Sequence, residues 1–164
     1  VNVSALEFRQ PHFVQRLTDV LQHEGLPPPC LELEITETLL LQDVQEVSQR
    51  LLALAQLGVG LVIDDFGTGY SSLAYLKKLP IQKLKIDQSF VRGLPSDEED
   101  RAIVAAVASM GQALGIQVLA EGVETVAQKE ALHALHCHFY QGFLCSPAVP
   151  AQAVLPLLQH TPGV

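Results

Sequence analysis

A polar side chain stands at or near the end of every short apolar run in this chain. The apolar runs have the pattern of strands, and each is followed by a longer segment with helical periodicity. Strands separated by helical segments imply βαβ units and a parallel sheet, and therefore the α/β class. The six expected strands are Val1–Val3, Leu31–Ile35, Gly60–Ile63, Lys83–Ile86, Gln117–Ala120 and Phe139–Leu144.

The polar residues at the strand ends discriminate between two α/β architectures. Polar groups at the carboxyl ends of successive parallel strands meet at one end of a (β/α) barrel, whereas an open doubly wound sheet gathers ligands around one switch point. Because all the expected strands contribute, the sequence favours a TIM-type (β/α) barrel. Taking one residue for each strand, the set is Asn2, Glu34, Asp64, Lys85, Glu121 and Gln141.

The length limits how much of that barrel is present. A complete barrel of this type has about 250 residues, and this chain has 164. We therefore expect a single domain over residues 1–164. It is expected to be an incomplete barrel with about six of the eight βα units, truncated at its N-terminal side.

The helical segments carry start and stop signals. Asp43–Leu57 has its apolar residues on one face and is followed by Gly58, a typical helix end. Capping boxes are expected at two helix starts, at Ser96 with Glu99 and at Thr125 with Gln128. The remaining helices are expected at His12–His23, at Ser71–Lys78 and, closing the fold, after Pro147.

Composition excludes several classes of partner. The net charge of −8 disfavours binding to a phosphate backbone, so no DNA partner is expected. No apolar stretch is long enough to cross a bilayer, so this segment is not expected to contact a membrane. The odd number of cysteines, with no CxxC spacing, indicates free thiols in a reducing compartment and hence the cytoplasm; they are Cys30, Cys137 and Cys145.

Acidic residues dominate the strand-end positions. Clustered carboxylates repel one another, and divalent cations relieve that repulsion. An all-oxygen set that also includes the amide of Asn2 suits Mg²⁺ or Mn²⁺. Such acids can also simply cap the following helices. Capping is a ready explanation for a single strand-end acid, but a poor one for acids at so many strands. The acids are Glu34, Glu37, Asp64, Asp65, Asp87, Glu121 and Glu124.

Asp64–Ser72 is the most specific segment, because two acids run directly into glycines and then into hydroxyl residues. With this segment included, the chain resembles the EAL domain family, bacterial phosphodiesterases that hydrolyse cyclic di-GMP. The resemblance runs from residue 1 to about residue 147. The matching motifs are Val1–Ser4, Glu32–Glu37, Asp64–Ser72, Lys85–Asp87, Ala120–Glu124 and Gln141–Phe143.

The resemblance implies a two-metal hydrolysis of cyclic di-GMP to linear pGpG, with Mg²⁺ or Mn²⁺ as cofactor. Lys85 is implied to orient the hydrolytic water, and Glu121 to act as general base or as a ligand of the second metal. Glu37 is implied to anchor a loop that couples metal binding to dimer contacts. The implied metal ligands are Asn2, Glu34, Asp64, Asp65 and Glu121. Support of substrate or loop is implied for Glu37, Asp87, Glu124, Gln141, Gly67, Thr68 and Gly69.

One departure from the family pattern bears on activity. The Glu-Ala-Leu motif that gives the family its name, with its metal-binding Glu and neighbouring Arg, is missing. Glu130–Leu132 spells the same letters, but it lies inside an expected late helix. We therefore expect the 164-residue chain to be inactive or weak by itself. The parent protein is expected to be active and to associate as a homodimer or larger assembly. Diguanylate-cyclase or sensor domains, or a membrane anchor, can lie in its other segments.

Two alternative functions stay open from the sequence. One is a non-catalytic relative of the same fold that binds the nucleotide or a protein. The other is an unrelated barrel metalloenzyme. A zinc site is disfavoured because the spacing of its candidate ligands is irregular; these are His133, His136, Cys137 and His138.

Overall fold

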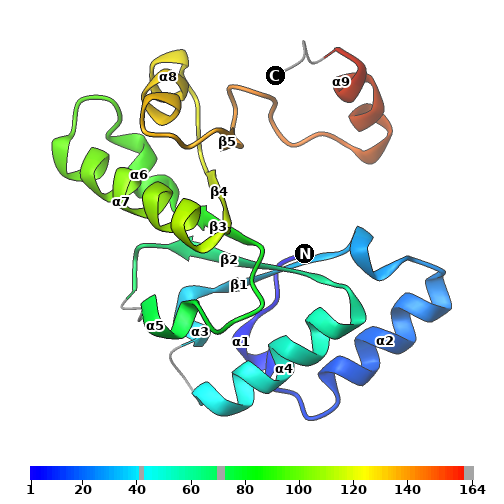
Figure 1. Ribbon diagram of the computed structural model, residues 1–164. Coiled ribbons are helices and arrows are strands. Elements are labelled where there is room, and N and C mark those ends of the chain that lie inside the picture. The colour runs from blue at the N-terminus through cyan, green and yellow to red at the C-terminus, as the bar shows by residue number, and fades with distance from the viewer. Residues whose placement is uncertain (41–42, 70–72, 161–164) are drawn as a thin grey trace.

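Five parallel strands form one sheet whose spatial order follows the chain, β1-β2-β3-β4-β5 (Figure 1). The computed structural model describes residues 1–40, 43–69 and 73–160. Neighbouring strands pair in register, with Leu33 beside Leu61 and Leu84 beside Val118. The strands are β1 (Glu32–Thr36), β2 (Gly60–Phe66), β3 (Lys83–Ile86), β4 (Gln117–Ala120) and β5 (Phe139–Tyr140).

Helices connect successive strands, as parallel pairing requires. The long helices bury one apolar face against the sheet, with Leu51 and Leu54 of α4 and Val104 of α7 fully buried. The helices with their bounds are α1 (Ala5–Phe8), α2 (Phe13–Glu24), α3 (Glu37–Leu40), α4 (Val44–Leu57), α5 (Leu73–Leu76), α6 (Gln88–Arg92), α7 (Glu98–Leu114), α8 (Val126–Ala134) and α9 (Val154–His160). Two short 3₁₀ helices are η1 (Pro28–Cys30) and η2 (Ala151–Ala153).

The two faces of the sheet differ as the alternation of residue types predicts. In β1, Leu33 and Ile35 are buried in the core, while Glu32 and Glu34 lie on the other face and keep some exposure. This alternation follows from the two-residue repeat of a strand. One face therefore packs against helices, and the other carries the polar side chains of the candidate site.

The first and last expected strands are shorter than predicted. Residues 1–3 form only one parallel bridge, between Asn2 and Glu34, in place of a strand. β5 ends at Tyr140 because the chain then packs closely on a neighbouring loop. A Cβ at Gly142 would lie 2.3 Å from the backbone nitrogen of Val123, so only a glycine allows the two segments to approach so closely, and they are joined there by a hydrogen bond from the Val123 nitrogen to the Gln141 carbonyl. The described residues thus form an unclosed sheet of five strands, one fewer than the six expected.

Helix boundaries agree with the sequence pattern except at two sites. Asp97, and not Ser96, caps α7, since its carboxylate accepts from the backbone nitrogens of Glu99 and Asp100. The capping box at Thr125 is confirmed. Of the segment expected from Ser71, residues 70–72 lie outside the described residues, and α5 begins at Leu73.

The C-terminal segment forms the expected helix but does not close the fold. In α9, Leu155 and Leu158 are 63% and 71% exposed. Figure 1 shows α9 apart from the sheet at the end of an extended connection. In the part of the chain that the structure describes, no helix has the length and apolar character needed to cross a membrane.

Candidate active site

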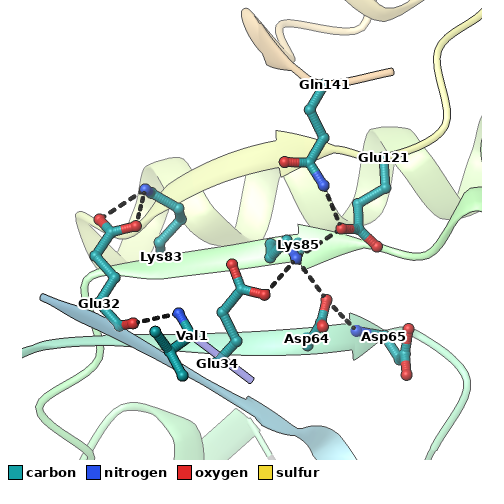
Figure 2. A network of polar contacts seen from close by, with 9 residues as sticks. All are labelled: Val1, Glu32, Glu34, Asp64, Asp65, Lys83, Lys85, Glu121 and Gln141. Carbon is teal, nitrogen blue, oxygen red and sulfur yellow. Dashed lines mark hydrogen bonds and ion pairs between the residues drawn. The ribbon is translucent and has the colours of Figure 1, made fainter. Parts of the chain in front are cut away.

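The Lys85 ammonium lies at the centre of the polar face and contacts three carboxylates (Figure 2). Its Nζ lies 2.9 Å from Glu34 Oε2, 3.0 Å from Asp64 Oδ1 and 2.7 Å from Glu121 Oε1. The Lys85 side chain is only 7% exposed. An ammonium so placed is a fixed positive charge within a negatively charged cluster.

Four neighbouring strands supply this cluster at their carboxyl ends. Glu34 comes from β1, Asp64 from β2 and Lys85 from β3, and Glu121 directly follows β4. The residues flanking Lys85, Leu84 and Ile86, are fully buried on the opposite face. Burial of that face fixes the register, and the register brings side chains from distant parts of the sequence together.

An irregularity in β2 brings two consecutive acids to the same place. Consecutive residues of a regular strand point to opposite faces. Between Ile63 and Phe66 the pairing of β2 with β3 shifts, and Asp65 has a φ of 53°, in the left-handed region. A bulge of this kind redirects one side chain. As a result, oxygens of Asp64, Asp65 and Glu121 all lie within 4.8 Å of one another.

Proton affinities in the cluster reflect burial and charge. Burial and the neighbouring Asp64 and Asp87 carboxylates raise the pKa of Asp65. Burial also raises the pKa of Glu121, although the hydrogen bond from Lys85 opposes that rise. Burial lowers the pKa of Lys85, but its three carboxylate contacts outweigh that effect and the net shift is upward. Lys85 therefore stays charged at neutral pH.

Glu37 holds the loop that follows β2. Its carboxylate oxygen Oε2 accepts hydrogen bonds from the backbone nitrogens of Gly67 and Gly69, at 3.0 Å each. The side chain is almost fully buried. The Thr68 hydroxyl donates to the carbonyl of Asp65 at 2.8 Å. The loop is thus tied to α3 on one side and to the bulge on the other, while residues 70–72 lie outside the described residues.

Of the remaining residues named from the sequence, some contact the cluster and others do not. Gln141 is part of it, since its Nε2 donates to Glu121 Oε1 at 2.7 Å. Asp87 caps α6 by accepting from the backbone nitrogen of Ser89. The Glu124 side chain is exposed, and within the described residues it has no ion pair or hydrogen bond to the cluster.

Asn2 lies opposite Glu34 in a parallel bridge. Its bridge with Glu34 includes a hydrogen bond from the Glu34 nitrogen to the Val1 carbonyl and one from the Val3 nitrogen to the Glu34 carbonyl, at 2.8 and 2.9 Å. Asn2 is exposed. The bridge places Asn2 beside one proposed metal ligand, at the edge of the sheet.

A second ion pair on the same face joins two residues that the sequence did not identify as candidate site residues. Lys83 Nζ contacts both carboxylate oxygens of Glu32, each at 2.8 Å (Figure 2). The signal for it is present in the sequence, since each partner stands two residues before a member of the central cluster, Lys85 or Glu34.

The donors fit a hard divalent cation better than zinc. Carboxylate oxygens are the ligands that Mg²⁺ and Mn²⁺ prefer, and Asp64, Asp65 and Glu121 offer three within one small space. Cys137, in contrast, is buried and its thiol contacts the carbonyls of Val118 and Phe139, so it faces the core.

Comparison with known proteins identifies the family. The model of the EAL domain matches residues 1–148. The chain belongs to the EAL domain family. It is 45% identical over 155 residues to the bifunctional diguanylate cyclase/cyclic di-GMP phosphodiesterase MucR of Pseudomonas aeruginosa, a match that covers 94% of this chain and 23% of MucR.

Solved EAL structures have the same fold. The MucR phosphodiesterase in complex with cyclic di-GMP superposes with a TM-score of 0.90 at 45% identity, over 94% of this chain and 62% of that chain. A manganese and cyclic di-GMP complex of Klebsiella pneumoniae BlrP1 gives a TM-score of 0.80 at 36% identity, over 88% of this chain and 37% of that chain. The chain therefore spans less than two thirds of the length of each of these relatives.

Proposed function

We propose that this EAL chain is part of a domain that hydrolyses cyclic di-GMP to linear pGpG with Mg²⁺ or Mn²⁺ as cofactor. The observation that carries the proposal is the contact of Lys85 with three carboxylates at the carboxyl edge of four parallel strands. The named complexes of MucR and BlrP1 support the choice of nucleotide, and the manganese in the BlrP1 complex supports the choice of cation.

The acidic residues are the proposed cation ligands. A cation bound there supplies a Lewis acid that activates a water and neutralises a phosphoryl oxygen. Asp64 and Asp65 are neighbours in sequence, so the bulge that brings both carboxylates together is part of the proposed ligand geometry. The full proposed ligand set is Asn2, Glu34, Asp64, Asp65 and Glu121.

Lys85 and Glu121 are the proposed catalytic residues. The Lys85 ammonium, held by three contacts, orients the attacking water and offsets negative charge that develops on the phosphoryl group. Glu121 Oε1 accepts from both Lys85 and Gln141. We propose two alternatives for Glu121: as general base, its other oxygen takes the proton of the water, or else it is a ligand of the second metal.

The loop after β2 has a proposed supporting role. Glu37 fixes two of its backbone nitrogens, and this loop begins directly after Asp65. We propose that the loop joins the metal site to a contact between two copies of the domain. Gly67, Thr68 and Gly69 belong to this loop, and Asp87, Glu124 and Gln141 form the proposed rim of the substrate site.

The parent protein is proposed to be larger and cytoplasmic in this part. The sheet of the described residues is unclosed, and the chain covers 62% of the solved MucR phosphodiesterase chain. We propose that the isolated chain hydrolyses cyclic di-GMP weakly or not at all, because the Glu-Ala-Leu motif and its Arg are missing from it. The name of MucR supports a companion diguanylate-cyclase domain. The free thiols support a reducing compartment.

The experiment measures pGpG by chromatography after the full-length protein is incubated with Mn²⁺ or Mg²⁺ and cyclic di-GMP. We expect turnover that requires the cation and is lost in Asp64→Asn and Glu121→Gln. Glu130→Gln is the matched control, since Glu130 is exposed on α8. Tight binding of cyclic di-GMP without any turnover would instead support a non-catalytic binding module.

A further inference from the structure

Two ion pairs span β2 on the face that carries the site, one after the other along the strands (Figure 2). One pair joins Glu34 of β1 to Lys85 of β3 at 2.9 Å. The other, to its left in Figure 2, joins Glu32 to Lys83 through both carboxylate oxygens, each 2.8 Å from Nζ. In both pairs, β1 supplies the acid and β3 the base.

The strand register shows that Lys83 stands level with Glu34. Glu34 pairs with Val62 across β1 and β2, and Val62 pairs with Lys83 across β2 and β3. Lys83 nevertheless binds Glu32, which lies two residues earlier on β1. The carboxylate at the level of Lys83 is therefore bound by a different lysine.

Lys83 has the reach to bind Glu34 instead. Adjacent strands lie about 4.8 Å apart, so β1 and β3 lie about 10 Å apart across β2. Lys85 spans this width and also a two-residue step along the strand to contact Glu34. The width alone is a shorter distance, so Glu34 lies within the reach of Lys83.

The sheet leaves room for Glu32 in its present position. A Cβ on Gly60, the partner of Glu32 in β2, would lie 2.9 Å from Glu32 Cγ. The Glu32 stem therefore occupies space that only a glycine leaves open. The Lys83 side chain is 18% exposed, so most of it is withdrawn from water and a carboxylate partner stabilises its charge.

We propose that Glu32 is a positioning residue for the candidate metal site. By binding Lys83, it keeps that ammonium away from Glu34 and leaves Glu34 to Lys85 and to a divalent cation. Without Glu32, the Lys83 ammonium turns to Glu34 and competes with the cation for the same oxygens. This inference rests on the proposed function, because Glu34 is a proposed ligand there.

The test measures Mn²⁺ affinity by titration of the full-length protein, with free Mn²⁺ followed by electron paramagnetic resonance. We expect Glu32→Ala to weaken the affinity by about tenfold to a hundredfold, the range found when a residue that orients a metal ligand is removed. The double variant Glu32→Ala with Lys83→Met should recover most of this loss, because the competing ammonium is gone.

The single variant Lys83→Met separates this effect from a long-range field. Two adjacent opposite charges act on a nearby cation with similar strength and opposite sign. If the charges of Lys83 and Glu32 acted only through their electric field at the cation, Lys83→Met would tighten Mn²⁺ binding about as much as Glu32→Ala weakens it. We expect a clear asymmetry, with Lys83→Met close to the unmodified protein. Equal and opposite effects, or no recovery in the double variant, would overturn the inference.

Two further results distinguish this inference from the proposed function. If the unmodified protein binds no Mn²⁺, the metal-dependent function is wrong and the role of Glu32 falls with it. If it binds Mn²⁺ and Glu32→Ala binds equally well, only the inference is wrong. A crystal structure of Glu32→Ala should place Lys83 Nζ about 3 Å from a Glu34 oxygen. Because Glu32 is half exposed, its removal should leave the fold intact, which an unfolding curve checks.

Discussion

Replacing Lys85 by methionine should cost more stability than any other charge removal on this face. Methionine keeps most of the side-chain volume and removes only the ammonium. Glu34, Asp64 and Glu121 then lose the cation that all three contact. Their side chains are 22%, 13% and 16% exposed, so water compensates only in part.

The expected size follows from that burial. Removing one partner of a buried ion pair typically costs about 3–5 kcal/mol. Because the three acids keep some contact with water, we expect a loss of about 3 kcal/mol in the free energy of unfolding. Lys83→Met is the matched control on the same strand. Its partner Glu32 is 50% exposed, so the loss should stay below about 1 kcal/mol.

The pH dependence has a definite sign. The pKa of Lys85 is raised above its ordinary value of 10.5, so its contribution is fully present below that value and disappears only at higher pH. In Lys85→Met, Glu121 loses the hydrogen bond and the charge that hold its pKa down, so burial raises that pKa further. That variant should therefore recover stability as pH falls and protonates Glu121, and its deficit should be larger at about pH 8 than at about pH 5.

Urea unfolding followed by far-ultraviolet circular dichroism, at both pH values and with a chelator present, measures these differences. The reasoning is refuted if Lys85→Met is as stable as the unmodified protein at the higher pH. It is also refuted if the deficit of Lys85→Met grows on acidification, since protonated carboxyls need no counter-ion.

Three other predictions concern the loop, a close backbone contact and the thiols. Glu37→Gln should lower the free energy of unfolding by about 1–3 kcal/mol, because both loop nitrogens donate to one charged carboxylate oxygen and a neutral amide oxygen in its place is a weaker acceptor; an unchanged urea midpoint would contradict it. Gly142→Ala should cost about 3 kcal/mol or more, since its Cβ meets neighbouring backbone at 2.3 Å, whereas Gly115→Ala, with open space at a φ of +68°, should cost about 1 kcal/mol. Burial raises the pKa of the Cys137 thiol to about 11, so only the two exposed thiols should react with a disulfide reagent at about pH 8 in the folded protein. Fast labelling of all three thiols would contradict this expectation. Stability should also fall as pH rises from 9 toward 11, because the unfolded state ionises that thiol first, and a urea midpoint that stays constant over this range would contradict that.

Much of the fold could be predicted from local pattern. The alternation of Leu33 and Ile35 with Glu32 and Glu34 indicates one apolar and one polar face, and the structure confirms it. The capping box at Thr125 is equally local, because it needs only residues within one turn. The first and last strands were overpredicted, because strand pairing depends on neighbours that periodicity does not report.

The candidate site was less predictable than the strands that carry it. The sequence placed an acid or an amide at the end of five strands and a lysine at the end of the other, and the structure brings Glu34, Asp64, Lys85, Glu121 and Gln141 together. In the structure, the Glu124 side chain makes no contact with this cluster within the described residues. A strand-end position fixes only which edge of the sheet a residue occupies, and not which way its side chain turns.

The sequence by itself determined the class of the fold, the edge on which chemistry gathers and the family, because all three depend on residue types and their spacing. Only the tertiary structure decided the pairing. Two features depend on the stagger between strands. One is the bulge in β2 that brings Asp64 and Asp65 together, and the other is the pairing of Lys83 with Glu32 instead of Glu34. That stagger is set by packing of the buried face across the whole sheet, and no local pattern encodes it.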